Sequence, residues 1–294
     1  MSKQNQSFQE LNLCNSFLFA AALEQPEICR LVLEIILGHK VPQVKVHAEH
    51  SVLVSSDFRS VRFDVYASDK LRVAYNVEAQ NENEGNLPKR SRYYQAEMDV
   101  SSLGPGADFN ELRSGYVIFI CTFDPFGMGL YRYTFEERCL ECDLPLGDGT
   151  RKIFLNTKGR NSADVPAELV HFLGYMEKST DAYVSEVTDQ SIIQLHERVT
   201  ELKKRRKLEA RFMTGEELMM QRERKGRQAG LAEGKAKGFT EGKANSILEL
   251  LEDCGTVPES LKTKLYEQKD ADILTRWLKL SARVTTVEQF TEQM

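Results

Sequence analysis

The sequence predicts an α/β fold, with a mixed sheet flanked by helices, followed by a helical C-terminal region. Three observations support this prediction. Near the N-terminus, apolar residues recur at helical spacing in Ile28, Leu31, Val32, Ile35 and Ile36. Between residues 41 and 80 the period changes to two, and β-branched and aromatic residues are enriched. After about Lys178 the strand pattern ends, and helical segments rich in charge follow.

The first expected elements are helical and then extended. Residues 8–37 form one or two helices, with Gly38 as a C-cap. Three strands follow at about 44–54, 58–67 and 71–80, and a hairpin turn at Ser68, Asp69 and Lys70 joins the last two.

The remaining elements complete the order α, three β, α, β. Asn86 is expected to cap a helix over residues 87–103, with Pro88 in its first turn and Gly104 at its end. The apolar run 116–123 predicts a buried strand with both faces covered. Further strands near 131–136 and 152–155 precede a helix that runs from about Pro166 to Glu177.

The changes in character predict four segments along the chain. Residues 1–178 form the α/β domain, residues 179–225 a charged helical region, and residues 226–245 a glycine-repeat helix or linker. Residues 246–294 form a small helical bundle, in which Pro258 marks a helix start and Asp270 a cap.

Composition excludes several classes of protein. The apolar share of 41% and the charged share of 28% are typical of a globular protein rather than a disordered or membrane protein. The most apolar stretch, residues 11–23, is too short to span a bilayer, and no signal peptide pattern precedes it. We therefore expect a cytoplasmic protein without membrane association.

Charge and cysteine usage narrow the classes further. The net charge of −5 argues against indiscriminate coating of nucleic acid. Residues 196–243 nevertheless carry 14 Lys and Arg against eight Asp and Glu, a local excess of +6 that leaves −11 for the rest. The six cysteines are too sparse for a disulfide scaffold. Only Cys139 and Cys142 form a C-x-x-C pair, and without a second pair they do not indicate a zinc site.

Glycine recurs every four residues inside the charged region, at Gly226, Gly230, Gly234, Gly238 and Gly242. Each glycine costs a helix about 1 kcal/mol relative to alanine, so a helix here needs compensation. Two interpretations remain open. A second helix can approach closely along the glycine ridge and make a homo-oligomer, or the segment can serve as a semi-flexible linker with i,i+4 ion pairs.

Two acidic residues on neighbouring strands are the candidate site. Alternation places Asp64 on the face opposite the apolar residues of its strand, and places Glu78 likewise on the next strand. If Ala67 pairs with Val73, Glu78 is the diagonal neighbour of Asp64, roughly 7 to 8 Å away. Two carboxylates at that separation can hold one Mg²⁺ or Mn²⁺ ion, although exposed strand carboxylates are more often only solvated.

The residues around this pair resemble a known family. The blocks are 62–67 (RFDVYA), 75–80 (YNVEAQ), 87–95 (LPKRSRYYQ), 115–121 with 123–127 (GYVIFIC and FDPFG), and 154–159 (FLNTKG). Together they resemble the PD-(D/E)XK nuclease family transposases, also called recombination-promoting nucleases. The resemblance covers residues 8–178 and, more weakly, the helical tail.

The resemblance implies a restriction-endonuclease-like core that cuts DNA with a divalent metal, Mg²⁺ or Mn²⁺, in a protein linked to recombination or mobile elements. Asp64 and Glu78 match the two acidic positions of the family. They and the Ala79 carbonyl are the implied metal ligands, and Gln80 is expected to place the attacking water. In the wider superfamily a lysine usually stands at the Gln80 position, so the cationic role is unassigned.

Basic residues at the start of the next helix are candidates for that role. Lys89, Arg90 and Arg92 are expected to supply positive charge and to bind DNA phosphates, where helix N-terminal amides assist. Each of them can equally be a solvated residue. The adjacent Tyr93 and Tyr94 are expected to pack or to form hydrogen bonds rather than to take part in catalysis.

Gln80 also favours a rival interpretation. The chain can be a catalytically inactive DNA-binding or oligomerisation protein that keeps the nuclease fold. A third interpretation, a scaffold built on the glycine-repeat helix, predicts no affinity for DNA. His47 and His50 have no acidic partner at ligand spacing, and the basic run 203–207 is either a phosphate contact or a solvated helix face.

Overall fold

The computed structural model describes residues 7–47, 51–52, 61–62, 65–70 and 73–294. The chain divides into two compact units, Met1–Phe212 and Met213–Met294. The first unit is α/β and the second is helical, so the predicted fold class is confirmed. The finer division into four segments remains a prediction.

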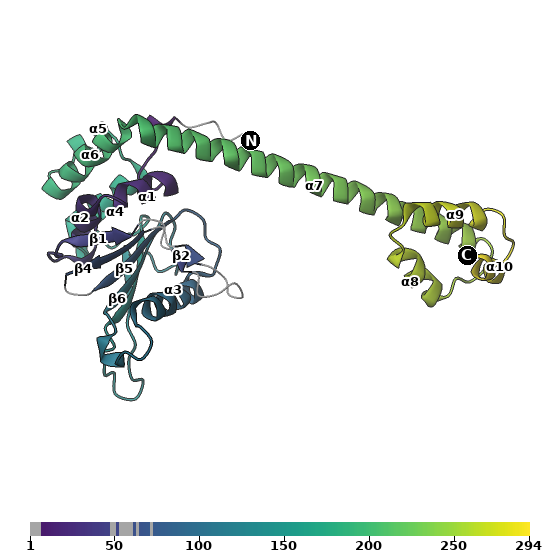
Figure 1. The fold of residues 1–294 in the computed structure, drawn as a ribbon, viewed down its shortest axis with the longest axis horizontal. Helices are drawn as coiled ribbons and strands as arrows, with labels where there is room; N and C mark the ends of the chain where they lie inside the picture. Colours follow the sequence, from purple (N-terminus) through teal and green to yellow (C-terminus); the bar gives the residue numbers. More distant parts are fainter. Residues whose placement is uncertain (1–6, 48–50, 53–60, 63–64, 71–72) are drawn as a thin grey trace. The chain divides into compact units, whose positions relative to one another are not determined.

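A six-stranded mixed sheet forms the centre of the first unit (Figure 1). Its order is β1 (Val44–His47), β4 (Val65–Asp69), β5 (Ala74–Gln80), β6 (Gly115–Cys121), β8 (Thr150–Asn156) and β7 (Arg132–Phe135). β5, β6 and β8 run parallel, and the remaining pairs are antiparallel. β2 (Ser51–Val52) and β3 (Val61–Arg62) pair separately. The expected strands 44–54 and 58–67 therefore each contribute to two different strands.

The hairpin between β4 and β5 differs from the prediction in two ways. Ser68 and Asp69 belong to strand β4 rather than to the turn. Ala67 pairs with Tyr75 rather than with Val73, so the observed register is two residues away from the expected one. The Asp69 side chain accepts hydrogen bonds from the Val73 amide at 3.0 Å and from the Tyr75 hydroxyl at 2.9 Å, which stabilises the longer strand. Asp64 lies outside the described residues.

Helices cover both faces of this sheet. They are α1 (Ser16–Leu23), α2 (Pro26–Leu37), α3 (Leu87–Ser102), α4 (Ala167–Glu177), α5 (Asp181–Ser185) and α6 (Gln190–Lys203), with short 3-10 turns η1 (Phe8–Glu10), η2 (Phe109–Glu111) and η3 (Ser162–Asp164). Gly38 ends α2 in the left-handed conformation with φ 73°, as predicted for a C-cap glycine. The helix expected near 87–103 is α3, and the one expected to end at Glu177 is α4.

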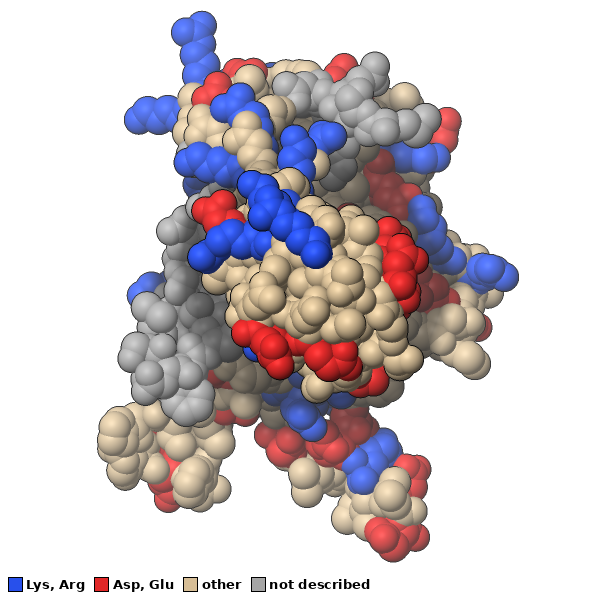
Figure 2. Space-filling view, turned by 90° about the vertical axis from the view of Figure 1, so that its right-hand side faces the viewer, with Lys and Arg blue, Asp and Glu red and all other residues tan. Residues whose placement is uncertain are grey.

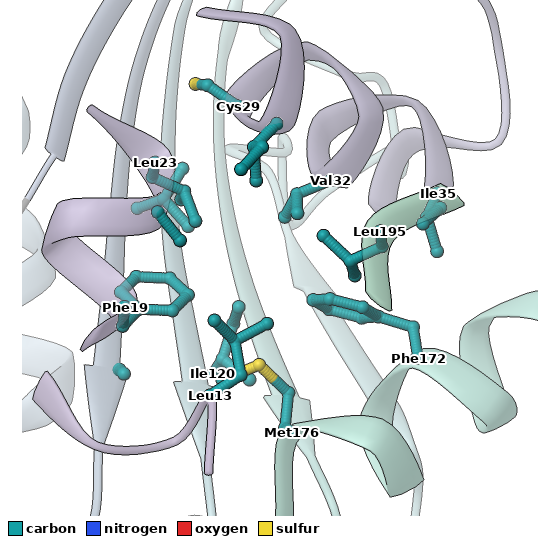
Figure 3. Close-up of a cluster of buried hydrophobic side chains, with 14 of the residues drawn as sticks. Leu13, Phe19, Leu23, Cys29, Val32, Ile35, Ile120, Phe172, Met176 and Leu195 are labelled. Carbon is teal, nitrogen blue, oxygen red and sulfur yellow. The ribbon is translucent and has the colours of Figure 1, made fainter. Parts of the chain in front are cut away.

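The larger core lies on one face of the sheet. Figure 3 shows Phe19 of α1, Val32 of α2 and Phe172 of α4 pointing toward one another over Ile120 of β6. Alternate residues of β5, Tyr75, Val77 and Ala79, belong to the same cluster. The period-two pattern of the sequence directs these side chains to one face, which four helices then cover.

The opposite face of the sheet carries a second, smaller core. Leu87, Tyr94 and Met98 of α3 pack there with Val117 and Phe119 of β6. Only the alternative in which the strand carboxylates are merely solvated predicted an open face here. The face is covered by α3, so polar side chains on this face of β5 are buried.

The second unit contains three short helices and most of a long one. α7 (Arg206–Glu252) begins in the first unit, and α8 (Glu259–Glu267), α9 (Ala271–Ser281) and α10 (Val287–Gln293) follow. Ile247, Leu251, Leu265, Leu274 and Phe290 are central to its buried core. As predicted, Asp270 caps α9, where its carboxylate accepts from the amides of Asp272 and Ile273. The glycine repeat lies within α7.

The surface carries charges of both signs. The face in Figure 2 shows Lys and Arg beside Asp and Glu in several places, rather than one uniform field. All six cysteines are free thiols. Among the helices of the described residues, none has both the length and the apolar character needed to cross a bilayer.

Candidate active site

Strand β5 brings the second predicted carboxylate under helix α3. Asn76, Glu78 and Gln80 alternate with the core residues of β5, so their side chains lie on the face that α3 covers. Glu78 is only 1% exposed and Asn76 is fully buried. A carboxylate at such a depth is costly unless charged or hydrogen-bonding partners surround it.

Arg90 of α3 supplies the charged partner of Glu78. Its Nη2 donates a hydrogen bond to Oε2 of Glu78, and its Nη1 donates to Oε1 of Gln80 at 3.1 Å. Nε2 of Gln80 donates in turn to Oε2 of Glu78 at 3.3 Å. The three side chains therefore form a closed set, which we call the Glu78–Gln80–Arg90 triad. The amide of Gln80 is oriented by both charged neighbours.

Two aromatic rings fix the position of the guanidinium. The Cζ of Arg90 lies 5.3 Å from the ring centroid of Tyr94 and 5.4 Å from that of Phe119. Its Nε donates to the Tyr94 hydroxyl at 2.9 Å. Cation–π attraction and this hydrogen bond hold the charge in place. Tyr94 thus packs and forms a hydrogen bond at the site, as expected from its helical spacing.

Electrostatics keeps Arg90 charged and Tyr94 neutral. Burial by itself lowers the pKa of Arg90, but the interactions with Glu78 and Tyr94 together outweigh burial, and the net pKa is raised. Burial, followed by the negative charge of Glu78, raises the pKa of Tyr94 to about 12. At neutral pH the site therefore contains a guanidinium and a neutral phenol.

Only one of the three basic candidates at the start of α3 reaches the carboxylate. Pro88 lies in the first turn, where its missing amide hydrogen costs nothing. Asn86 stands at the N-cap position, but its side chain does not cap the helix and donates to Glu84 instead. Arg90 points toward β5, while Lys89 and Arg92 are exposed. The structure thus brings Arg90, Glu78 and Gln80 together and leaves Lys89 and Arg92 on the surface.

The backbone of β5 places the Ala79 carbonyl on the other side of the strand from β6. The Gln80 carbonyl accepts from the Thr122 amide, and the Ala74 amide donates to the Ser114 carbonyl, so even-numbered residues of β5 bond toward β6. Because successive carbonyls alternate, that of Ala79 points toward β4.

The oxygen donors of this site suit a hard divalent cation. The carboxylate of Glu78 and the carbonyl of Ala79 are ligands of the type that Mg²⁺ and Mn²⁺ prefer. Within the described residues no group of three His, Cys, Asp or Glu side chains is gathered for a metal. Such a site therefore needs the backbone carbonyl, waters or a further ligand.

Sequence reasoning missed the exclusive role of Arg90 and an aromatic cavity next to it. The spacing of Arg90 and Tyr94, four residues apart on a helix, was the available signal for the first. The cavity is lined in part by Phe126, Phe135 and Phe154, which come from three different segments. Its signal in the sequence was weak, because single phenylalanines in strands and neighbouring loops are usually core residues.

Comparison with known protein families gives a match within the first unit. A model of the PD-(D/E)XK nuclease family transposases matches residues 17–139, which contain β5, α3 and the whole Glu78–Gln80–Arg90 triad. No curated protein and no solved structure gives a significant match. Residues 17–139 are therefore similar to the PD-(D/E)XK nuclease family transposases, and this similarity supports a nuclease-like function for the first unit.

Proposed function

We propose that this protein is a metal-dependent endodeoxyribonuclease that hydrolyses DNA phosphodiester bonds in recombination or in the activity of mobile elements. The observation that carries the proposal is the Glu78–Gln80–Arg90 triad, which unites a carboxylate, an amide and a cation within the segment that matches a nuclease family. A nuclease needs groups of these three kinds to hold a metal, orient a water and offset phosphate charge.

In the proposed site, Asp64, Glu78 and the Ala79 carbonyl hold one Mg²⁺ or Mn²⁺ ion. When bound, the ion lowers the pKa of a water and offsets the charge that develops on the phosphate. The Gln80 amide would orient the water. The water oxygen would attack phosphorus while the bond to the leaving oxygen breaks, and the proton that the water releases would end on the leaving oxygen. Lys89 and Arg92, which are exposed on α3, bind the phosphates that flank the cleaved bond.

Arg90 takes over the cationic role of the absent lysine in this proposal. Its Nη1 lies 3.1 Å from the Gln80 side chain, so its charge is close to the position at which the superfamily usually places a lysine. A guanidinium presents a fork of donors that matches phosphate oxygens. Its ion pair with Glu78 also means that a metal ion and Arg90 share one carboxylate.

A plasmid-nicking assay tests this function. The parent protein should nick supercoiled DNA with Mg²⁺ or Mn²⁺ and should be inactive in EDTA. Glu78→Gln and Asp64→Ala should each remove cleavage while the protein remains folded. Glu82→Gln, which changes an exposed carboxylate on the loop after β5, is the matched control and should cleave like the parent. A folded Glu78→Gln protein that nicks at the parental rate would show that the proposal is wrong.

One observation favours a second function, that of a catalytically inactive DNA-binding protein. The Glu78 carboxylate is buried and already paired with Arg90, as in a structural ion pair. In that case gel shifts should show DNA binding in EDTA, and nicking should be absent with every metal. Binding that weakens steeply with salt would identify phosphate contacts.

A further part of the proposal concerns the glycine repeat of α7. The five glycines are exposed, and a Cβ added at any of them would meet no described atom within 4 Å. The same helix exposes Leu231 and Phe239 by 57% and 56%. A second copy of the helix packed along this ridge would cover the apolar side chains and offset the cost of the glycines. We therefore propose a homo-oligomer, with a linker role as the alternative.

A further inference from the structure

A cavity of about 350 Å³ lies beside the triad, between the start of α3 and the strands β7 and β8. No role has been assigned to it in the proposed hydrolysis. It is lined by Pro88, Ser91, Arg92, Phe126, Phe135, Glu136, Glu137, Lys152 and Phe154.

Three phenylalanines form the apolar wall of this cavity. Phe126 packs edge-on against Phe154 with ring centroids 5.1 Å apart, and Phe135 packs edge-on against Phe154 at 5.7 Å. Phe154 is buried, whereas Phe135, at the end of edge strand β7, is 44% exposed. The contacts fix the Phe135 ring while leaving much of it uncovered. A fixed and partly exposed ring at a cavity is a platform for stacking a flat, unsaturated ligand.

The polar residues of the cavity favour a neutral ring over an anion. Glu136, which pairs with Arg138 at 2.6 Å, and Glu137 contribute carboxylates, whose remaining lone pairs can accept hydrogen bonds from the exocyclic amino groups of a base. Lys152 lies 3.6 Å from Glu137, and so its charge is partly offset within the cavity. Arg92 is exposed on α3 and leaves a positive charge at the rim. A nucleotide whose base lies inside the cavity and whose phosphate lies at the rim matches both the carboxylates inside and the positive charge of Arg92.

The cavity is connected to the triad through stacked rings. Phe154, which lines the cavity, stacks on Phe119 with ring centroids 5.4 Å apart and an interplanar angle of 13°. Phe119 in turn contacts the guanidinium of Arg90, a member of the triad. Ser91 and Arg92, which line the cavity, directly follow Arg90 in α3. A nucleotide held in the cavity is therefore a close neighbour of a phosphate bound at the triad.

We propose that this cavity binds one nucleobase that has left the stack of a DNA strand, stacking it on Phe135 and bonding its polar edge to Glu136 or Glu137. The inference rests on the proposed function, since it takes DNA to be the substrate. Extracting a base from a duplex costs stacking and pairing energy, and least for a base that has no partner. DNA with one unpaired base should therefore bind more tightly than a fully paired duplex.

The test measures binding of the full chain in EDTA, where cleavage does not interfere. A duplex with a single bulged adenine should bind about tenfold more tightly than the paired duplex, which is the range expected for one base–aromatic stack. Phe135→Ala should remove this preference and leave affinity for the paired duplex unchanged, and Phe135→Trp should retain it. Phe109→Ala removes an 80% exposed phenylalanine that does not line the cavity, and serves as the matched control.

The outcomes separate this inference from the proposed function. Equal affinity of the parent for bulged and paired DNA overturns the base-binding cavity, even if the protein cleaves DNA. A preference that survives in Phe135→Ala overturns it as well. If free adenosine monophosphate displaces the bulged DNA at concentrations similar to that of the DNA, the cavity binds a free nucleotide rather than a base of DNA. Failure to bind any duplex overturns both proposals. Thermal unfolding of each variant confirms that loss of binding is not loss of fold.

Discussion

Arg90 on helix α3 forms an ion pair with Glu78 on strand β5, and this contact joins the helix to the sheet at the candidate site. Glu78 is 1% exposed at its side chain and Arg90 is 25% exposed. The pair therefore lies at the edge of the smaller core, where the carboxylate is buried and the cation still reaches solvent. We expect the stability of the fold to depend on this pair, and the proposed cleavage as well, and experiments can separate the two effects.

Replacing Arg90 with methionine should destabilise the protein. The substitution keeps much of the apolar volume but leaves the Glu78 carboxylate without its guanidinium. Removing one member of a buried pair costs about 3–5 kcal/mol, and partial exposure of Arg90 reduces this to about 2 kcal/mol. Urea denaturation measures the change. Arg92→Met on the exposed side of the same helix should change the unfolding free energy by less than about 0.5 kcal/mol. Similar effects at the two positions would argue against a stabilising pair.

Arg90 should also oppose metal binding. Its positive charge lies next to the proposed metal ligand Glu78, so Arg90→Gln should bind Mg²⁺ more tightly, by about fivefold if about 1 kcal/mol of repulsion is removed. The same variant should cleave DNA more slowly, because the cation that faces the phosphate is gone. Calorimetric titration and nicking rates measure the two effects. Weaker Mg²⁺ binding by a folded Arg90→Gln protein would place the ion elsewhere.

The loop after β6 should lose stability in acid through Asp124. Burial by itself raises the pKa of this carboxyl, but hydrogen bonds from the Tyr133 hydroxyl and from the amides of Gly129, Phe126 and Gly127 outweigh it and lower the pKa. A lowered folded-state pKa means stability that is present above the unfolded value of about 3.9 and lost as pH falls through the folded value. Asp124→Asn should therefore reduce stability at pH 7 and flatten its fall below about pH 4. Denaturation at a series of pH values measures the free energy of unfolding. If it falls below pH 4 as steeply in Asp124→Asn as in the parent, the prediction is wrong.

Two glycines should respond to alanine in opposite directions. At Gly159 a Cβ would lie 2.7 Å from the Tyr131 Cα, a backbone atom that cannot rotate away. Overpacking of this kind costs about 1–3 kcal/mol, so Gly159→Ala should lower the melting temperature. At Gly234 a Cβ meets nothing within 4 Å inside a helix. There alanine should add about 1 kcal/mol of helix stability. A melting temperature unchanged in Gly159→Ala would mean that the loop has room to shift.

The glycine ridge of α7 should control self-association. Replacing Gly230 and Gly234 with alanine keeps the helix and raises its intrinsic stability, but prevents close approach of a second helix. Sedimentation equilibrium should therefore show weaker association for the double variant than for the parent. Ala229→Ser, next to the ridge on the same helix, is a suitable small-residue control. A monomeric parent protein would leave the linker role as the function of this segment.

The sequence alone predicted the main order of helices and strands and the resemblance to a nuclease family. Period-two alternation identified β5, a proline in the first turn located the start of α3, and the continuous apolar run identified β6 as the buried parallel strand. These properties depend on residues near one another in the chain, and local spacing reports them directly. The motif blocks around Glu78 carry the resemblance to the nuclease family for the same reason.

Only the tertiary structure decided which side chains meet. The register of β4 against β5 depends on where the strands end and the turn begins. A shift of two residues keeps every side chain on the same face, so the alternation pattern could not reveal it. Arg90 and Glu78 lie twelve residues apart, and their contact exists because α3 packs across the polar face of β5. The aromatic cavity likewise assembles Phe126, Phe135 and Phe154 from a loop and two strands. Long-range packing sets these contacts, and no local pattern encodes it.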